Sequence, residues 1–365
     1  MIQKIKLNSF RNFKTKEVTF SDGITLILGP NASGKTNILE SLYLLSTGKS
    51  FKARVEEEMI NYKSNLSRIS GVLPGATTLE AVITRGYIDI GAARPEKAPK
   101  KRLLVNGIPK RMVDFAGNFK TVLFGPWDMD LVTESPSIRR RFLDNVLSQV
   151  DREYRRSILS YEKGLRQRNR VLWGIREGNI SRDRLVFWDQ LLIKNGDYVT
   201  KKRQELIEFI NNHHSLSPNS YSISYDSSVI SQGRLDQYKY EEVSSATTLV
   251  GPHRDDFIFF KSITGRTGSA GRELAAYGSR GEQRMGVLWL KMAELSYIEE
   301  KNIEAGAETS SARPTLLLDD IFSELDEEHR ELAMKVATEQ QTIITSVNDE
   351  FTKELKKVDR IDLIG

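Results

Sequence analysis

Residues Gly29 to Thr36 read GPNASGKT and match G-x-x-x-x-G-K-[ST], a pattern that binds phosphate groups. Its glycines let backbone N–H groups turn toward phosphate oxygens, and the helix that follows adds a favourable dipole. We expect Lys35 to reach the β- and γ-phosphates of ATP and Thr36 to bind the accompanying Mg²⁺. The expected nucleotide contacts of this segment are Gly29, Pro30, Asn31, Ala32, Ser33, Gly34, Lys35, Thr36 and Asn37.

A second segment that could serve this chemistry is the apolar run 316–318, which ends in Asp319 and Asp320. Such a run is typical of a buried strand that delivers carboxylates to the edge of a sheet. There Asp319 would hold Mg²⁺, and Asp320 would orient or deprotonate the attacking water. Taken alone, a strand that ends in a solvated acidic turn explains the run better. Together with the phosphate-binding loop, it predicts an ATP-hydrolysing site with Lys35, Asp319 and Asp320 as catalytic residues.

A third segment, residues 277–284, would by itself be a linker followed by a helix start. It precedes the strand of Asp319 by about one helix and one linker. Ser-x-Gly-[Glu/Gln] at a helix start is also the pattern of the signature motif of ABC-type ATPases. In that role Ser279 and the backbone of Gly281 donate hydrogen bonds to a γ-phosphate. Residues 323–326, which read SELD, then correspond to the D-loop.

The hydrophobic pattern predicts the elements that position these residues. A strand near 2–7 is followed by a turn at 21–23, which predicts a hairpin into a strand at 24–28. Short β-like pieces between 70 and 106 predict an antiparallel sheet beside the nucleotide-binding core. Long Arg-rich helical segments after about residue 124 predict a second lobe. The other expected elements are helices at 36–45, 137–173, 184–213, 282–301 and 327–338, strands at 221–224, 315–318 and 342–345, and a polar linker at 304–313.

The predicted fold class is therefore α/β. It comprises a P-loop ATPase core of the ABC type, with a mixed sheet and flanking antiparallel strands, and an inserted, mostly helical second lobe. The expected boundaries give residues 1–123 and 272–365 to the discontinuous ATPase lobe and residues 124–271 to the insertion. Two domains agree with a length of 365 residues, since a typical domain has about 150.

The composition excludes several classes of protein. The absence of cysteine excludes disulfides, a zinc finger and a cysteine nucleophile, and four histidines leave little for a metal cage. No stretch reaches the roughly 18 apolar residues of a membrane helix, and the N-terminus lacks the pattern of a secretory signal. We expect a cytoplasmic protein without a membrane partner. A net charge of +5 favours a polyanionic partner such as nucleic acid.

Basic residues concentrate at the start of the second lobe, opposed by fewer acids. Such residues would bind phosphates in a sequence-tolerant, salt-sensitive way, although for any single arginine a solvated helix face is the better explanation. Residues 253–256, which read HRDD, invite a metal or nuclease interpretation, but an ion-pair network in a loop explains them better. The basic residues are Arg139, Arg140, Arg141, Arg152, Arg155, Arg156, Lys163, Arg166, Arg168 and Arg170.

Several runs together resemble ABC-type ATPases of the SMC branch and, within it, the RecF family of bacterial recombination mediators. Residues 8–13 (NSFRNF) are similar to the opening of that family, so Arg11 and Asn12 are expected at the nucleotide site. Its further motifs resemble residues 48–52 (GKSFK), 139–144 (RRRFLD), 167–169 (QRN) and 251–256 (GPHRDD). The sequence departs from the family at Glu282, where many members carry Gln. The Q-loop stays unassigned between Gln149 and Gln167.

The resemblance implies an ATP-gated clamp on DNA at gaps or junctions. The Walker motifs of one subunit and the Ser279 motif of the other would sandwich each ATP, so ATP would drive homodimerisation and hydrolysis would release it. Hydrolysis would be slow and stimulated by DNA, whose expected form is a gap or a junction between single and double strands. The implied partners are RecO and RecR, which act with the protein in loading RecA.

Three other functions fit parts of the sequence. An ABC transporter ATPase would carry a switch histidine after the strand 342–345, where the sequence has Thr345-Ser346. A DNA-binding protein could use ATP only as a conformational latch, against which Asp319 and Asp320 argue. A small-molecule kinase is disfavoured by the Ser279 motif and the inserted lobe.

Overall fold

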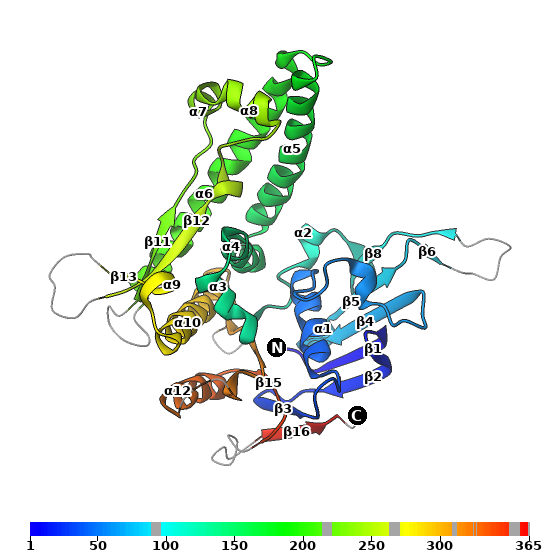
Figure 1. Cartoon of the computed structure of the whole chain (residues 1–365). Coiled ribbons are helices and arrows are strands. Elements are labelled where there is room, and N and C mark those ends of the chain that lie inside the picture. The colour runs from blue at the N-terminus through cyan, green and yellow to red at the C-terminus, as the bar shows by residue number, and fades with distance from the viewer. Residues whose placement is uncertain are drawn as a thin grey trace. The chain divides into compact units, whose positions relative to one another are not determined.

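The computed structural model describes residues 1–88, 96–213, 221–262, 271–308, 312–323, 325, 327–349 and 358–363. The chain forms two compact units, the first made of Met1–Asp128 and Ile298–Gly365 and the second of Met129–Tyr297 (Figure 1). Residues 272–297 fall in the second unit because they pack there: the ring of Trp289 lies 6.2 Å from that of Tyr221. This division by contacts differs from the boundaries expected at 123/124 and 271/272, which remain a prediction.

A parallel sheet forms the centre of the first unit. Every strand pair within it is parallel, and the inner strands β14 and β15 are fully buried, as expected where both faces are covered. The helix α12 (Glu327–Thr338) lies between two of these strands in the chain. In spatial order the strands are β10 (Thr121–Phe124), β14 (Thr315–Asp319), β15 (Thr342–Ser346), β3 (Ile24–Leu28) and β16 (Val358–Asp362).

An antiparallel sheet is the second layer of this unit. The predicted hairpin at 21–23 is wrong. The hairpin lies instead between β1 and β2, with Phe10 paired to Phe13, and residues 21–23 carry the chain into the parallel sheet. The reason is that β3 has four of its five residues buried, which suits an inner strand. The order is β2 (Phe13–Thr19), β1 (Lys4–Phe10), β4 (Leu66–Val72), β5 (Thr78–Thr84), β8 (Lys101–Val105) and β9 (Ile108–Lys110); β6 (Tyr87–Ile88) and β7 (Glu96–Lys97) form a separate ribbon.

The helix α1 (Lys35–Thr47) lies between these two sheets and joins their cores. Eleven of its thirteen residues are buried. One continuous apolar cluster contains Leu42 of α1, Leu7 of β1 and Leu317 of β14. A helix that is buried on almost all sides can be held only between two apolar layers.

The second unit is mostly helical and carries a small antiparallel sheet. Two of its long helices, α5 (Arg152–Arg176) and α6 (Val186–Asn212), are consecutive and pack together (Figure 1). Along the described residues, no helix has both the length and the apolarity to cross a membrane. The other elements are α3 (Asp130–Thr133), α4 (Pro136–Val150), β11 (Tyr221–Asp226), α7 (Gln232–Gln237), α8 (Lys239–Ser245), β12 (Asp256–Lys261), β13 (Arg272–Glu273), α9 (Leu274–Tyr277) and most of α10 (Arg280–Glu304), whose last residues from Ile298 on belong to the first unit. The helix α2 (Met112–Phe115) also belongs to the first unit.

Buried ion pairs tie the elements of the second unit together. Arg203 of α6, only 1% exposed, donates to Asp144 of α4 and to the fully buried Asp255, at 2.8 Å each. Arg139 of α4 makes a two-bond pair with Asp256 at 2.6 and 2.9 Å. The expected ion-pair network is therefore confirmed for the two aspartates.

His253 takes part in this region as a neutral residue. Burial lowers the pKa of His253 to about 4, so the ring is uncharged at neutral pH. Its Nε2 lies 3.0 Å from the carbonyl oxygen of Thr248, and its Nδ1 lies 2.8 Å from the Tyr161 hydroxyl. A carbonyl can only accept, so Nε2 carries the proton and Nδ1 accepts from Tyr161. Both nitrogens are thus used inside the protein, which leaves neither for a metal.

We predict that Arg203→Met destabilises the second unit by about 3–5 kcal/mol, because it leaves the Asp255 carboxylate buried and uncompensated. Urea unfolding followed by circular dichroism measures the loss. Lys201→Met, at an exposed position of the same helix, should change stability by less than about 0.5 kcal/mol. Equal effects of the two substitutions would contradict the prediction.

Candidate functional site

The loop between β3 and α1 has a shape that only glycine permits at two positions. Gly34 has φ +103°, and a Cβ there would lie 2.5 Å from Cζ of Phe13 and 2.7 Å from Nδ2 of Asn12. A Cβ on Gly29 would lie 2.7 Å from the Ser33 hydroxyl oxygen. Such contacts are too close for any side chain, so the sequence dictates a tight turn of bare backbone at the start of α1.

The polar groups of this loop suit a phosphate ligand. Lys35 is 8% exposed, and its Nζ donates to the carbonyl oxygens of Gly29 (2.6 Å) and Pro30 (3.0 Å), so its ammonium group lies over the loop. The buried hydroxyl oxygen of Ser33 has no hydrogen-bond partner among the described residues. Buried polar atoms are nearly always paired, so an unpaired donor beside an ammonium group fits an oxyanion.

The same loop meets the acidic end of β14. The Thr36 hydroxyl donates to both carboxylate oxygens of Asp319, at 2.9 and 3.1 Å, although 283 positions separate the two residues. Asp319 is 4% exposed and also accepts from the hydroxyl of Thr345, at 2.5 Å. A hydroxyl and a carboxylate in contact form the oxygen set that Mg²⁺ prefers.

Asp320 follows Asp319 in a strained conformation. Its φ of +51° is uncommon for a residue with a side chain, and its N–H donates to the carbonyl oxygen of Thr345 at 3.1 Å. Sequence reasoning noted Thr345 only as the residue in the place of a switch histidine. The structure shows that it fixes both aspartates. The available signal was a pair of hydroxyl residues, Thr345 and Ser346, at the end of a buried strand.

Arg11 and Asn12 form the turn between β1 and β2, and they contact the site in different ways. Asn12 Nδ2 donates to the carbonyl oxygen of Ser33 at 3.1 Å, and its Oδ1 accepts from Nδ2 of Asn37 at 2.9 Å. Arg11 instead makes a two-bond pair, at 2.5 and 2.7 Å, with Glu40 of α1, whose side chain is fully buried. In this structure Arg11 therefore holds the turn in place, while Asn12 touches the loop.

Ser279 and Gly281 lie at the start of α10, in the second unit. The Ser279 hydroxyl accepts from the Glu282 N–H at 3.3 Å, and the Glu282 carboxylate accepts from the Ser279 N–H at 2.7 Å. This reciprocal pair is a capping box. The Ser279 N–H, together with Lys261 and Arg272, lowers the pKa of Glu282 to about 2, so the carboxylate stays charged. These two cations stabilise an acid at the position where the resemblance led us to expect Gln.

Two expected parts of the site gain no support. Glu324 and Asp326 of the D-loop lie outside the described residues. Gln149, on α4, and Gln167, on α5, both belong to the second unit, and the Q-loop stays unassigned.

A strand–loop–helix phosphate site beside an acid-ended strand of a parallel sheet defines a P-loop ATPase fold of the ABC type. The family model for the RecF/RecN/SMC N-terminal domain matches residues 1–363. A "DNA replication and repair protein RecF" from Herpetosiphon aurantiacus is 35% identical, over 96% of this chain and 94% of its own length. Another, from Agathobacter rectalis, is 33% identical, over 99% and 96%. The chain belongs to the RecF family.

Solved structures agree with this assignment. A structure of the recombination mediator RecF with ATP, in the RecFOR pathway, superimposes with a TM-score of 0.81 at 29% identity, over 96% of this chain and 92% of its own. An Smc head domain from Pyrococcus furiosus matches with a TM-score of 0.52 at 15% identity, which shows the shared fold. The expected fold class is therefore confirmed.

We predict that Gly34→Ala weakens nucleotide binding roughly tenfold or more, because the added Cβ forces an adjustment of about 1–3 kcal/mol at the loop. Titration with a fluorescent ATP analogue measures the affinity. Gly23→Ala is the matched control, since a Cβ there meets nothing within 4 Å. Unchanged binding by the Gly34 variant would contradict the role of this backbone turn.

Proposed function

We propose that the protein binds ATP with Mg²⁺, hydrolyses it slowly, and uses it to dimerise on DNA during recombinational repair. The observation that carries the proposal is the contact between Thr36 and Asp319, which joins the phosphate-binding loop to the acidic strand end. The relatives named for DNA replication and repair, and the RecF structure with ATP, support the same conclusion.

Each residue of the first unit takes a role that its chemistry allows. Lys35 exchanges the loop carbonyls for phosphate oxygens. Backbone N–H groups of the loop, except at Pro30, which has none, and the Ser33 hydroxyl donate to the same oxygens. Thr36 and Asp319 hold Mg²⁺, which neutralises charge on the phosphates when bound. Asp320 orients and deprotonates water, and the Thr345 carbonyl fixes its backbone.

The second unit supplies the surface for dimerisation. Ser279 is exposed at the N-terminus of α10, where backbone N–H groups favour an anion. We propose that Ser279 and Gly281 of one subunit close the nucleotide site of the other, so that the dimer depends on ATP.

The closed dimer would act on DNA. Gaps and junctions between single-stranded and double-stranded DNA are the proposed substrates, with RecO-type and RecR-type proteins as partners in recombinase loading. A chromosomal substrate makes the bacterial cytoplasm the proposed location. DNA would speed the slow hydrolysis.

A second candidate function is a DNA-binding protein in which bound ATP holds one conformation and is never hydrolysed. The effect of removing the Asp320 carboxylate distinguishes the two functions.

We predict that Asp320→Asn lowers ATP turnover about a hundredfold or more, the usual effect of losing a general base, while ATP binding persists. Phosphate release with and without DNA measures turnover. Asp359→Asn removes an exposed carboxylate of the same unit and should leave turnover unchanged. Wild-type turnover by the Asp320 variant would favour the latch.

We predict that Ser279→Arg prevents ATP-dependent dimerisation but not ATP binding, because a bulky cation would occupy the closing surface. Sedimentation velocity with ATP measures the oligomeric state. Ser245→Arg, which adds the same charge at an exposed position of α8, should dimerise like the wild type. A Ser279 variant that dimerises normally would disprove the shared site.

A further inference from the structure

Most of the basic residues at the start of the second unit fall into two groups that the sequence does not separate. Four arginines point inward. Arg139 pairs with Asp256, and Arg140 donates to the carbonyl oxygen of Asp255 at 2.8 Å. Arg168 pairs with Asp189 at 2.6 Å and with Glu242 at 2.7 Å, and Arg155 donates to the carbonyl oxygen of Ser148 at 2.5 Å.

The second group forms one face of α5. Seven residues of this helix are exposed, six are Arg or Lys, and none is acidic. Their intervals of three, four or seven residues place them on one side of the helix. Trp173, the seventh, is 52% exposed. We call this set the α5 face: Arg152, Arg156, Lys163, Arg166, Arg170, Trp173 and Arg176.

The neighbouring helix shows what an ordinary solvated face looks like in this unit. The exposed charges of α6 are two lysines, Lys194 and Lys201, and two acids, Asp197 and Glu208. The two positive and two negative charges cancel, and charges of both signs are the usual pattern of a helix face that contacts only water. The α5 face departs from that pattern, so solvation alone does not explain it.

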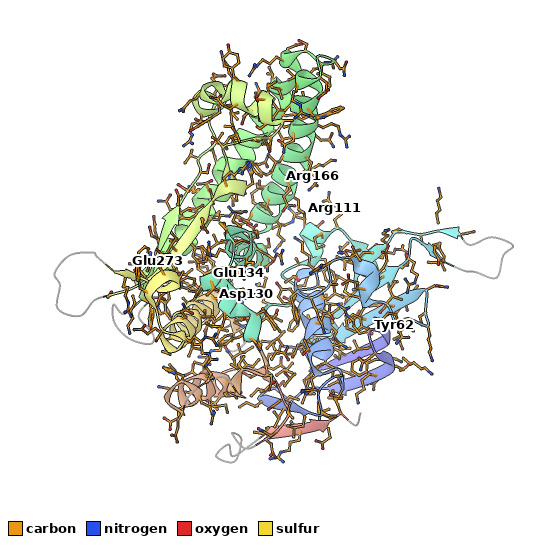
Figure 2. All side chains as sticks on the ribbon, in the orientation of Figure 1. Tyr62, Arg111, Asp130, Glu134, Arg166 and Glu273 are labelled. Carbon is orange, nitrogen blue, oxygen red and sulfur yellow. The ribbon has the colours of Figure 1, made fainter. Side chains whose placement is uncertain are left out.

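Few acidic residues of the second unit neutralise the positive charge of the α5 face. Arg156 pairs with Glu153 at 2.6 Å and Arg176 with Glu177 at 3.2 Å, both in exposed positions where such pairs contribute little. Lys163, Arg166 and Arg170 have no hydrogen-bond or ion-pair partner among the described residues. Arg166, labelled in Figure 2, lies between the other two on α5.

We propose that the α5 face binds the phosphate backbone of double-stranded nucleic acid without reading its sequence. From Arg152 to Arg176 the cations extend over about 36 Å, close to one turn of duplex DNA. A rigid straight row of cations matches a stiff duplex, whereas a flexible single strand would have to be ordered along it. This inference rests on the proposed function, and it identifies the surface that grips the DNA.

The salt dependence of binding tests the inference, because each lost phosphate contact lowers the slope of log K against log salt by about 0.9 on a duplex. Arg166→Gln/Arg170→Gln should reduce that slope by about 1.8, with the same fold and the same ATP binding as the wild type. Lys194→Gln/Lys201→Gln removes the same charge from α6 and should leave the slope unchanged. Fluorescence anisotropy of the full chain with ATP, on a duplex of about three helical turns and on a single strand of equal length, gives the slopes.

The outcomes separate this inference from the proposed function. If the wild type binds DNA with a steep slope and the two double variants retain that slope equally, the α5 face is not the contact surface, and DNA binding stands. A slope reduced only on the single strand would overturn the duplex assignment. If the wild type binds neither form of DNA, the proposed function itself fails.

Discussion

The contact between Thr36 and Asp319 is the interaction on which the first unit depends, because it requires two distant segments to reach the same sheet edge. Parallel strands deliver their carboxyl ends to one edge, so the ends of β3 and β14 reach the same edge with β15 between them. The strand β15 then supplies Thr345, whose hydroxyl and carbonyl fix the two aspartates. The order of the strands therefore determines which residues lie together in the site.

The position of α1 follows from the same constraint. A phosphate-binding helix must start at the sheet edge, and this one continues between two sheets and is buried almost throughout. Its fully buried Glu40 is compensated by Arg11, which anchors the turn that carries Asn12. A carboxylate buried without a partner would be strongly unfavourable, so the ion pair and the placement of Asn12 on the loop arise together.

The sequence predicted most of this arrangement wherever local chemistry and hydrophobic period agreed. The helix at 327–338 and the strands near 315–318 and 342–345 appear almost as expected. The helix shows helical spacing of its apolar residues, and the strands are short and rich in leucine, isoleucine or threonine. The hairpin at 21–23 failed because turn residues signal a reversal of the chain but not which sheet receives the next strand. The inward arginines could not be told from the outward ones, since their partners Asp189, Glu242 and Asp256 lie far away in the chain.

The glycines Gly34 and Gly281 differ in whether the folded chain itself excludes a side chain at their positions. At Gly34 the fold itself requires glycine, because its φ is positive and the side chains of Asn12 and Phe13 leave no room for a Cβ. Gly281 has no such requirement: a Cβ there would meet nothing within 4 Å, and its φ is not positive. Glycine leaves the backbone bare at this position, which is the second residue of α10. Bare backbone at an exposed helix start allows a ligand or a second chain to approach closely, as the proposed closure over the nucleotide of a second subunit would require.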